Sequence, residues 1–314
     1  MAEKTATREA YGAALTELGA ECKNLVVLDA DLAEATKTCK FKAAYPDRFF
    51  DCGIAEGNMM AVAAGLAAGG MIPFASSFAM FAAGRAFEQI RNTIGYPHLN
   101  VKIGATHAGL TVGEDGATHQ CNEDIALMRT IPGMTIINPA DAIETRAAVR
   151  AAAAYKGPVY LRFGRYAVPA VNTDDYKFEI GRAVELKDGE DVTIIATGLM
   201  VHMALEAAEI LAPAGIRARV VNMHTIKPLD EEAVRKAAKE TGAIVTAEEH
   251  SIIGGLGSAV AEVLCEKCPV PMRRVGVRDK FGKSGQVPEL LAEYGLTAAG
   301  IADAAKQVFA LKKQ

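Results

Sequence analysis

The stretch Phe49-Phe-Asp-Cys-Gly-Ile-Ala-Glu-Gly-Asn-Met-Met-Ala61 predicts a short strand, a turn at Gly53 and a helix whose first turn holds Glu56. An acidic side chain at a helix start suits the helix dipole, and this role alone would explain Glu56. However, Glu56 is the only charged residue in 54–71, and the helix expected over 59–68 is almost wholly apolar. A helix of this composition is buried against other elements. The stretch therefore predicts a strand, a turn and a buried helix, as in α/β folds.

Apolar, strand-like runs alternate with Ala-rich or amphipathic stretches along the chain, which predicts parallel sheets covered by helices. The alternation stops after Arg165 and resumes near residue 191, with turn-forming residues between. We therefore expect two consecutive α/β domains, at residues 1–172 and 191–314, joined by a linker at 173–190. The expected strands are Leu25–Asp29, Ile72–Ser76, Val101–Thr106, Met134–Asn138, Val159–Phe163, Val192–Ala196, Ala218–Met223, Ala243–Ala247 and Met272–Gly276. The expected helices of the second domain are Met200–Leu211, Asp230–Thr241 and Gly257–Cys265.

Composition excludes several classes of protein. The 314 residues carry a formal net charge of −4, which gives no sign of a nucleic-acid surface. The first residues lack the apolar core of a signal peptide, and no run reaches the roughly 18 apolar residues of a membrane span. We therefore expect a cytoplasmic protein that binds neither nucleic acid nor membrane. The six cysteines are scattered, and the pair Cys265 and Cys268 lacks a second ligand pair, so we expect reduced thiols and no metal site.

Two aromatic residues stand three apart in Ser76-Ser-Phe-Ala-Met-Phe81. In a helical turn, which this spacing predicts, the rings of Phe78 and Phe81 lie on one side and can stack on a planar ligand. Packing in the core would explain the pair equally well. The pair alone does not decide between these two roles.

A polar loop, Thr106–Gln120, follows the apolar strand expected at Val101–Thr106. It contains two histidines, two acids and three glycines. Active sites of parallel α/β sheets lie beyond the carboxyl ends of strands, so this loop is a candidate substrate site. The segment Tyr160-Leu-Arg-Phe-Gly-Arg165 places two guanidinium groups just past another strand, where they can bind phosphate oxygens in pairs. An ordinary surface charge remains the alternative for Arg165, and likewise for Arg8 in Ala6-Thr-Arg8.

The segment from Gly53 to Arg165 resembles the pyrimidine-binding domain of transketolases, and the chain from about residue 191 resembles their C-terminal domain. The resemblance implies thiamine diphosphate as the cofactor, with Glu56 as the acid that hydrogen-bonds its aminopyrimidine ring. Burial of such a carboxylate favours proton sharing with a ring nitrogen. The resemblance also implies that Phe78 and Phe81 line the pyrimidine. Members of the family often have a third aromatic residue three positions after the second. This chain has Gly84 at that position.

The same resemblance implies substrate-binding roles for the polar loop. His107 matches a contact near the sugar phosphate, and Asp115 matches a contact to a substrate hydroxyl that discriminates stereochemistry. His119 matches a catalytic contact near the reacting carbonyl.

The resemblance also implies where the substrate phosphate binds. Arg8 and Arg165 align with phosphate-binding arginines of the family. Where the family has a phosphate-contacting Ser, this chain has Ala35, so we expect either that Thr36 or Thr38 replaces it or that the acceptor preference differs.

The motif Gly-Asp-Gly, by which these families hold a divalent ion and the diphosphate, is absent from the sequence. The resemblance therefore implies an N-terminal transketolase subunit as partner. That subunit would carry Mg²⁺ or another divalent ion, and two such pairs would form a dimer of heterodimers. The segment Gly254-Gly255-Leu-Gly257 opens an expected helix and can cradle an anion, but close backbone packing is the more economical interpretation.

The implied activity is transfer of a two-carbon ketol unit from a ketose phosphate to an aldose phosphate, as in the pentose phosphate pathway. The beta subunit of a 2-oxoacid dehydrogenase and deoxyxylulose phosphate synthase share the Glu and the domain layout, and they remain alternatives. The loop Thr106–Gln120 favours transketolase, because a 2-oxoacid decarboxylase does not need contacts to a polyol. A non-catalytic α/β regulatory subunit would leave Glu56, the Phe pair and the His loop unexplained.

Overall fold

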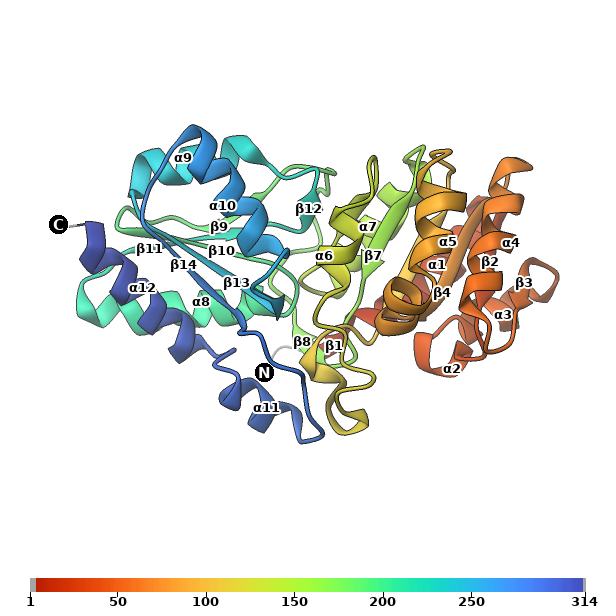
Figure 1. Ribbon diagram of the computed structural model, residues 1–314, viewed down its shortest axis with the longest axis horizontal. Coiled ribbons are helices and arrows are strands. Elements are labelled where there is room, and N and C mark those ends of the chain that lie inside the picture. The colour runs from red at the N-terminus through yellow and green to blue at the C-terminus, as the bar shows by residue number, and fades with distance from the viewer. Residues whose placement is uncertain (1–3, 313–314) are drawn as a thin grey trace.

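Two mostly parallel sheets, side by side, form the frame of the chain, of which the computed structural model describes residues 4–312 (Figure 1). The strands are β1 (Lys4–Ala6), β2 (Leu25–Asp29), β3 (Phe49–Asp51), β4 (Ile72–Phe78), β5 (Lys102–Thr106), β6 (Thr135–Ile137), β7 (Val159–Arg162), β8 (Ala167–Pro169), β9 (Val184–Lys187), β10 (Val192–Ala196), β11 (Ala218–Asn222), β12 (Thr225–Lys227), β13 (Ile244–Ser251) and β14 (Met272–Val277). The α-helices are α1 (Thr7–Glu21), α2 (Ala33–Thr36), α3 (Cys39–Ala44), α4 (Glu56–Ala68), α5 (Phe87–Gln89), α6 (Asp124–Arg129), α7 (Ala142–Ala154), α8 (Met200–Leu211), α9 (Glu231–Thr241), α10 (Leu256–Lys267), α11 (Val287–Glu293) and α12 (Ala298–Lys312). Shorter 3₁₀ or π-helical segments are η1 (Pro46–Arg48), η2 (Met80–Arg85), η3 (Ile90–Gly95), η4 (Leu110–Asp115) and η5 (Ala212–Ala214).

The first sheet has the strand order β12-β6-β7-β5-β4-β2-β3, and all its pairs except that of β12 with β6 are parallel. Successive residues of a strand point to opposite faces. In β2, Leu25 and Val27 pack with α1 and α7, whereas Val26 and Leu28 pack with α4 and η2. Both faces of this sheet are therefore buried, as is usual for parallel sheets.

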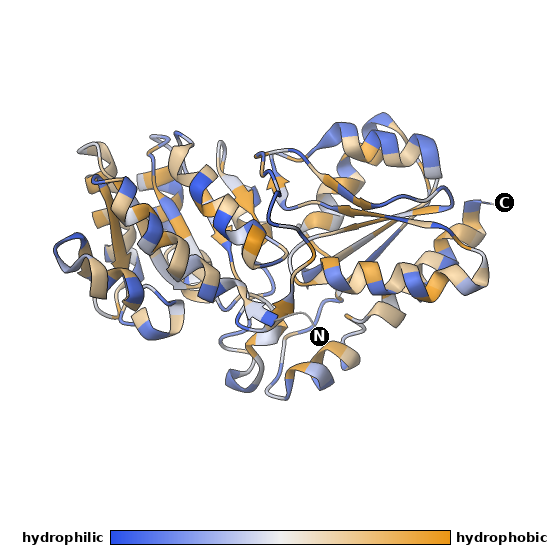
Figure 2. Cartoon of the chain, turned by 180° about the vertical axis from the view of Figure 1, so that it is seen from behind, coloured by the Kyte–Doolittle hydropathy of each residue, from blue (hydrophilic) through white to orange (hydrophobic). Residues whose placement is uncertain are grey.

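The second sheet has the order β14-β13-β10-β11-β9, and only the pair of β9 with β11 is antiparallel. Helices α8 and α12 cover one face and α9 and α10 cover the other. Figure 2 shows the same arrangement by hydropathy, with hydrophobic strands enclosed by helices of mixed character. The predicted α/β class with two successive sheets is confirmed.

Two edge strands differ from the expected pattern. Residues Val184–Lys187, which lie in the segment expected to be a linker, form β9 of the second sheet. Residues Thr225–Lys227 follow β11 in sequence but pair with β6 of the first sheet. Strands of three or four residues are too short to show an alternation pattern, and β12 ties the two halves of the chain together. The domain limits at 172 and 191 stay a prediction.

The glycines before α10 serve close packing, as expected. A Cβ atom on Gly255 would lie 2.0 Å from Oε2 of Glu248. The backbone N–H groups of Leu256 and Gly257 donate to the Glu248 carboxylate at 2.7 and 2.8 Å. The anion position at this helix start is thus filled by the protein's own side chain, and burial raises the pKa of Glu248 to about 7.

Within residues 4–312, no helix is long and apolar enough to cross a membrane. The same residues contain no group of three or more His, Cys, Asp or Glu side chains that could hold a metal ion. The six cysteines are free, with Cys265 exposed and Cys268 partly buried.

Candidate active site

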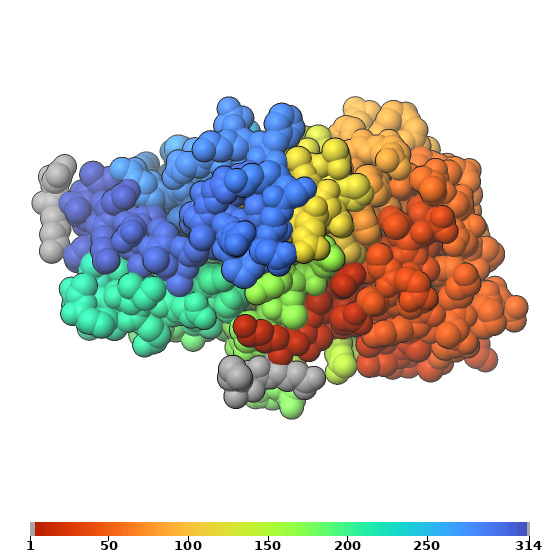
Figure 3. Space-filling model, turned by 90° about the horizontal axis from the view of Figure 1, so that it is seen from below, coloured from red at the N-terminus to blue at the C-terminus, as the bar shows by residue number. Residues whose placement is uncertain are grey.

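The candidate site residues follow the carboxyl ends of neighbouring parallel strands. Glu56 comes after β3, Phe78 ends β4, His107 directly follows β5 and Arg165 follows β7. Seen from below, the yellow segment that contains η4 and α6 lies between the two halves of the molecule (Figure 3). Residues from distant parts of the sequence meet at this edge of the sheet because parallel strands end there together.

Glu56 opens α4 and its side chain is 1% exposed. Arg85, the last residue of η2, donates from Nη1 to both carboxylate oxygens, at 3.0 Å to Oε1 and 2.8 Å to Oε2. The Arg85 side chain is 51% exposed. A buried carboxylate therefore lies beneath a half-exposed guanidinium group. The sequence predicts the buried acid but gives no sign of its cation.

The Phe pair is stacked, but not on a helical turn. Phe78 is the last residue of β4, which runs two residues further than expected, and Phe81 lies in η2. The prediction of one helical turn for both is wrong, because the strand ends inside the segment. The rings nevertheless stack, with centroids 5.7 Å apart and planes 18° apart. The guanidinium carbon of Arg85 lies 4.5 Å from the Phe81 ring centroid.

Gly84 supplies no aromatic ring to the pocket beside the Phe pair, and a neighbouring side chain takes up that space. A Cβ atom on Gly84 would lie 2.2 Å from Cε of Met80. Met80 therefore occupies the space that a larger residue at position 84 would need.

His107 adopts a positive φ of 56° directly after β5, and its ring stacks on Phe78 at a centroid distance of 3.8 Å. Nε2 lies 3.2 Å from Nη1 of Arg8, and Nδ1 lies 2.9 Å from the Thr106 hydroxyl. Burial, with the nearby charges of Arg8 and Arg165, lowers the pKa of His107 to about 3. An arginine can only donate, so Nε2 accepts and Nδ1 carries the proton. His107 is thus a neutral ring with a fixed tautomer.

Arg8 and Arg165 both lie beside this ring. Arg165 donates from Nη1 to the carbonyl oxygen of Val112, and the same nitrogen lies 3.9 Å from Oδ2 of Asp115. The pKa of Arg8 lies below its ordinary value. Burial is the main cause, Glu9 opposes the shift, and the charge of Arg165 adds to it. The structure therefore brings together two guanidinium groups, an imidazole and a carboxylate, as an anionic, hydroxylated ligand requires.

Neither Thr36 nor Thr38 offers a hydroxyl that could replace the family's phosphate-contacting Ser. Both side chains are fully buried, and both hydroxyls donate to Oδ2 of Asp29, at 2.7 and 2.8 Å. Burial raises the pKa of Asp29 to about 6. The carbonyl oxygen of Ala35 accepts from Arg8 at 2.9 Å. The expectation for both threonines is wrong because they hold the buried Asp29.

His119 links the polar loop to the aromatic pair. Its ring is partly buried and lies edge-on to Phe81, with centroids 5.3 Å apart and planes 72° apart. Nδ1 lies 2.9 Å from the Thr118 hydroxyl. His119 thus closes one side of the space beside the Phe rings.

Arg162 has a structural role. It is 3% exposed, donates from Nε to Oδ2 of Asp124 at 2.9 Å, and donates from Nη2 to the carbonyl oxygen of Glu249 at 2.9 Å. Oε1 of Glu249 accepts from the backbone N–H of Thr111 at 2.6 Å. These contacts fix the polar loop against β13 of the second sheet.

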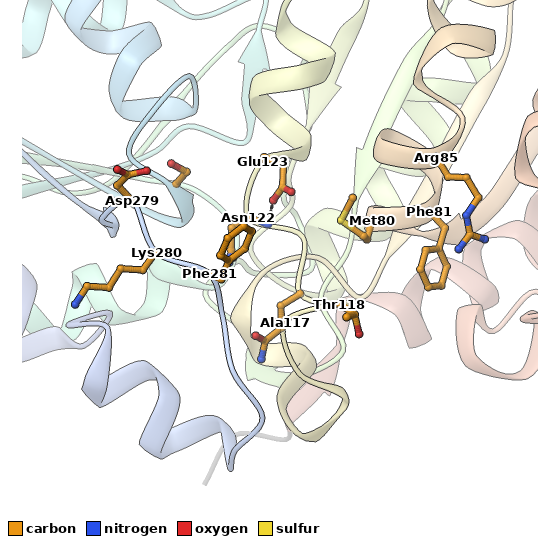
Figure 4. A pocket seen from close by; sticks show the side chains of 12 residues that line it. Met80, Phe81, Arg85, Ala117, Thr118, Asn122, Glu123, Asp279, Lys280 and Phe281 are labelled. Carbon is orange, nitrogen blue, oxygen red and sulfur yellow. Dashed lines mark hydrogen bonds between the residues drawn. The ribbon is translucent and has the colours of Figure 1, made fainter.

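A pocket of about 700 Å³ opens beside these residues, and both halves of the chain line it. Figure 4 shows Phe81 and Arg85 on one side and Asp279 and Lys280 on the other. This contribution of the second domain was not predicted, because the residues around Phe281 form no recognisable binding motif. The lining residues in the described part of the chain are Met80, Phe81, Arg85, Ala117, Thr118, Gln120, Asn122, Glu123, Ser251, Asp279, Lys280 and Phe281.

A buried carboxylate, an aromatic pair and a polar histidine loop at the edge of a parallel sheet define a ligand site of an α/β enzyme. Family models of the transketolase pyrimidine-binding domain and the transketolase C-terminal domain match residues 3–170 and 181–301. The chain belongs to the transketolase family, which depends on thiamine diphosphate, and the resemblance seen in the sequence is confirmed.

Three relatives illustrate this membership. The chain is 54% identical over 298 residues to a putative transketolase C-terminal section of Methanocaldococcus jannaschii, covering 94% of this chain and 93% of that protein. It is 48% identical to a 6-deoxy-6-sulfo-D-fructose transketolase subunit of a Clostridium species, covering 96% and 94%. A solved split-gene transketolase, described as an inactive beta4 tetramer, superposes with a TM-score of 0.91 at 56% identity, covering 99% and 100%.

Proposed function

We propose that this chain is one subunit of a two-chain transketolase that transfers a two-carbon ketol unit from a ketose phosphate to an aldose phosphate. One observation carries the proposal. A continuous series of contacts leads from the buried acid, across the aromatic pair, to the cations that suit a phosphate. Its members, in order, are Glu56, Arg85, Phe81, Phe78, His107 and Arg8.

The residues present fit one side of thiamine diphosphate. The Glu56 carboxylate is buried beside stacked aromatic rings, and this surrounding suits a planar ring with hydrogen-bonding nitrogens. The diphosphate and its divalent ion need a different set, which residues 4–312 do not offer as a cluster of acids or histidines. We therefore assign Mg²⁺ or another divalent ion, and the diphosphate, to an N-terminal partner subunit that carries Gly-Asp-Gly.

When bound, thiamine diphosphate supplies a nucleophilic carbon at its thiazolium ring. Glu56 would be placed to share a proton with a nitrogen of the aminopyrimidine ring, and Phe78 and Phe81 would wall this ring and exclude water. His119 is placed edge-on to both Phe rings, so it can contact the substrate near its reacting carbonyl. The chain thereby orients the cofactor and the reacting end of the substrate.

The other end of the substrate meets fixed positive charge. Arg8 and Arg165 each offer a guanidinium group that can donate hydrogen bonds to phosphate oxygens, whereas the neutral His107 offers hydrogen bonding without charge. Asp115 lies beside Arg165 and is 41% exposed, so it is available to a sugar hydroxyl. These four residues are our proposed determinants of substrate binding.

The decisive experiment reconstitutes this chain with a separately encoded chain that carries Gly-Asp-Gly, adds thiamine diphosphate and Mg²⁺, and follows transfer from xylulose 5-phosphate to ribose 5-phosphate. We expect transfer only when both chains are present, and a mass by light scattering that equals two of each chain. Turnover of pyruvate instead would favour a 2-oxoacid dehydrogenase beta subunit, and formation of deoxyxylulose phosphate would favour the synthase. Tight cofactor binding by the isolated chain would contradict the shared site.

A further inference from the structure

Arg85 makes two contacts at once. Its guanidinium donates to both oxygens of Glu56, and it lies over the ring of Phe81. A guanidinium group is planar, donates several hydrogen bonds and stacks on aromatic faces. In these three respects it resembles an aminopyrimidine ring.

Those two contacts are the ones that the proposed function assigns to the cofactor ring, which hydrogen-bonds Glu56 and lies against the Phe pair. Arg85 also lines the pocket, whereas Glu56 is 1% exposed and is not among the lining residues within 4–312. The guanidinium therefore covers the acid on the side from which a ligand in the pocket would reach it.

We propose that Arg85 is a placeholder for the aminopyrimidine ring: it occupies the position between Glu56 and Phe81 and leaves it when the cofactor binds. This inference rests on the proposed function. The half-exposed Arg85 side chain can turn into solvent, and the incoming ring then takes over the hydrogen bonds to Glu56, so the buried carboxylate is not left unpaired. While Arg85 is in place, it keeps a buried carboxylate paired.

A placeholder lowers the apparent affinity for the ligand that it mimics. The ligand can bind only to the fraction of molecules in which the Arg85 side chain has left the position. Removing the guanidinium group should therefore strengthen cofactor binding. A cation that instead stays on Glu56 beside the bound ring would give the opposite result, since its removal would cost a supporting contact.

The test measures the dissociation constant of thiamine diphosphate for the reconstituted two-chain complex at saturating Mg²⁺, by calorimetry. We expect Arg85→Ala to lower this constant about fivefold, and Arg85→Met, which retains the aliphatic stem, to do the same. Arg91→Ala is the matched control. Arg91 is an exposed arginine of η3 that donates to Asn92, and its removal should change nothing.

A double-mutant cycle connects the effect to Glu56. In a Glu56→Gln background the charge that holds Arg85 is gone, so Arg85→Ala should change the dissociation constant less than about twofold. Equal or weaker binding by both Arg85 variants, with normal binding by the parent complex, would overturn the placeholder alone. Failure of the parent complex to bind thiamine diphosphate would overturn the proposed function itself.

Discussion

Arg8 donates to Nε2 of His107 over 3.2 Å, and this contact fixes which nitrogen of the imidazole carries the proton. The Nδ1–H group then donates to the Thr106 hydroxyl at 2.9 Å. Because burial and the neighbouring cations lower the pKa of His107 to about 3, the ring stays neutral at physiological pH. In the proposed function, the charge that attracts an anionic substrate therefore comes from Arg8 and Arg165.

Replacing Arg8 by Ala should raise the KM for phosphorylated ketoses by about tenfold or more, since charge-assisted hydrogen bonds contribute about 1.5–3 kcal/mol. The rate constant kcat should change little, because the proposed function places Arg8 at the phosphate end of the substrate and not at the reacting carbonyl. Steady-state kinetics with an unphosphorylated ketose, whose KM should stay constant, is the control. An equal loss with both substrates would contradict the phosphate role.

Asp115 is expected to discriminate the configuration of a substrate hydroxyl. Replacing it by Ala should reduce the preference between donor ketoses that differ at one hydroxyl, measured as the ratio of their kcat/KM values. Glu114→Ala is the matched control, because Glu114 is the neighbouring exposed acid and accepts from Gln286 at 2.6 Å. An unchanged ratio in the Asp115 variant would count against this role.

Replacing Glu56 by Gln should lower kcat at least a hundredfold, as loss of a general acid or base usually does. The fold should persist, because Gln has the same shape and can still accept from Arg85. Activity and thermal unfolding of the reconstituted complex test both statements, with Glu88→Gln, a change to an exposed acid of α5, as control. A near-normal rate in the Glu56 variant would show that this acid has another function.

Local patterns in the sequence were sufficient for much of the fold. The bounds of β2, β10 and α8 are those expected, because each is a long apolar or amphipathic run with clear limits. Composition marked two candidates, one acid in an apolar helix and the histidines concentrated in one loop, and the resemblance to transketolases implied their roles. Such signals lie within a few residues of each other and need no knowledge of tertiary contacts.

Contacts between distant segments were not predictable in this way. Arg85 lies 29 residues after Glu56, and nothing in its neighbours indicates a pairing. The hydroxyls of Thr36 and Thr38 were expected to face a ligand, but they satisfy Asp29, which the sequence shows only as the end of a strand. Partners chosen by tertiary packing leave no periodic signal.

Glu249 gives a prediction about pH. It is 4% exposed at the junction of the two sheets, and burial raises its pKa to about 7, although Arg162 opposes this shift. The unfolded chain should titrate near the ordinary value of about 4.3, so the folded state binds more protons between these values. The stability that Glu249 contributes is present below pH 4 and is lost as the pH rises through about 7.

Glu249→Gln removes this titration and retains an oxygen that can accept from Thr111. The free energy of unfolding of the native protein, minus that of the variant, should therefore fall between about pH 4.3 and pH 7, by up to about 1.4 kcal/mol per pH unit, and level off above pH 7. Urea denaturation at several pH values measures the free energy of unfolding of each protein. Titrations that the native protein and the variant share cancel in the difference. Glu262→Gln, an exposed acid beside Arg129, should leave the difference flat. Parallel curves for the native protein and the Glu249 variant would show that this carboxylate is ionised in the folded protein throughout the range.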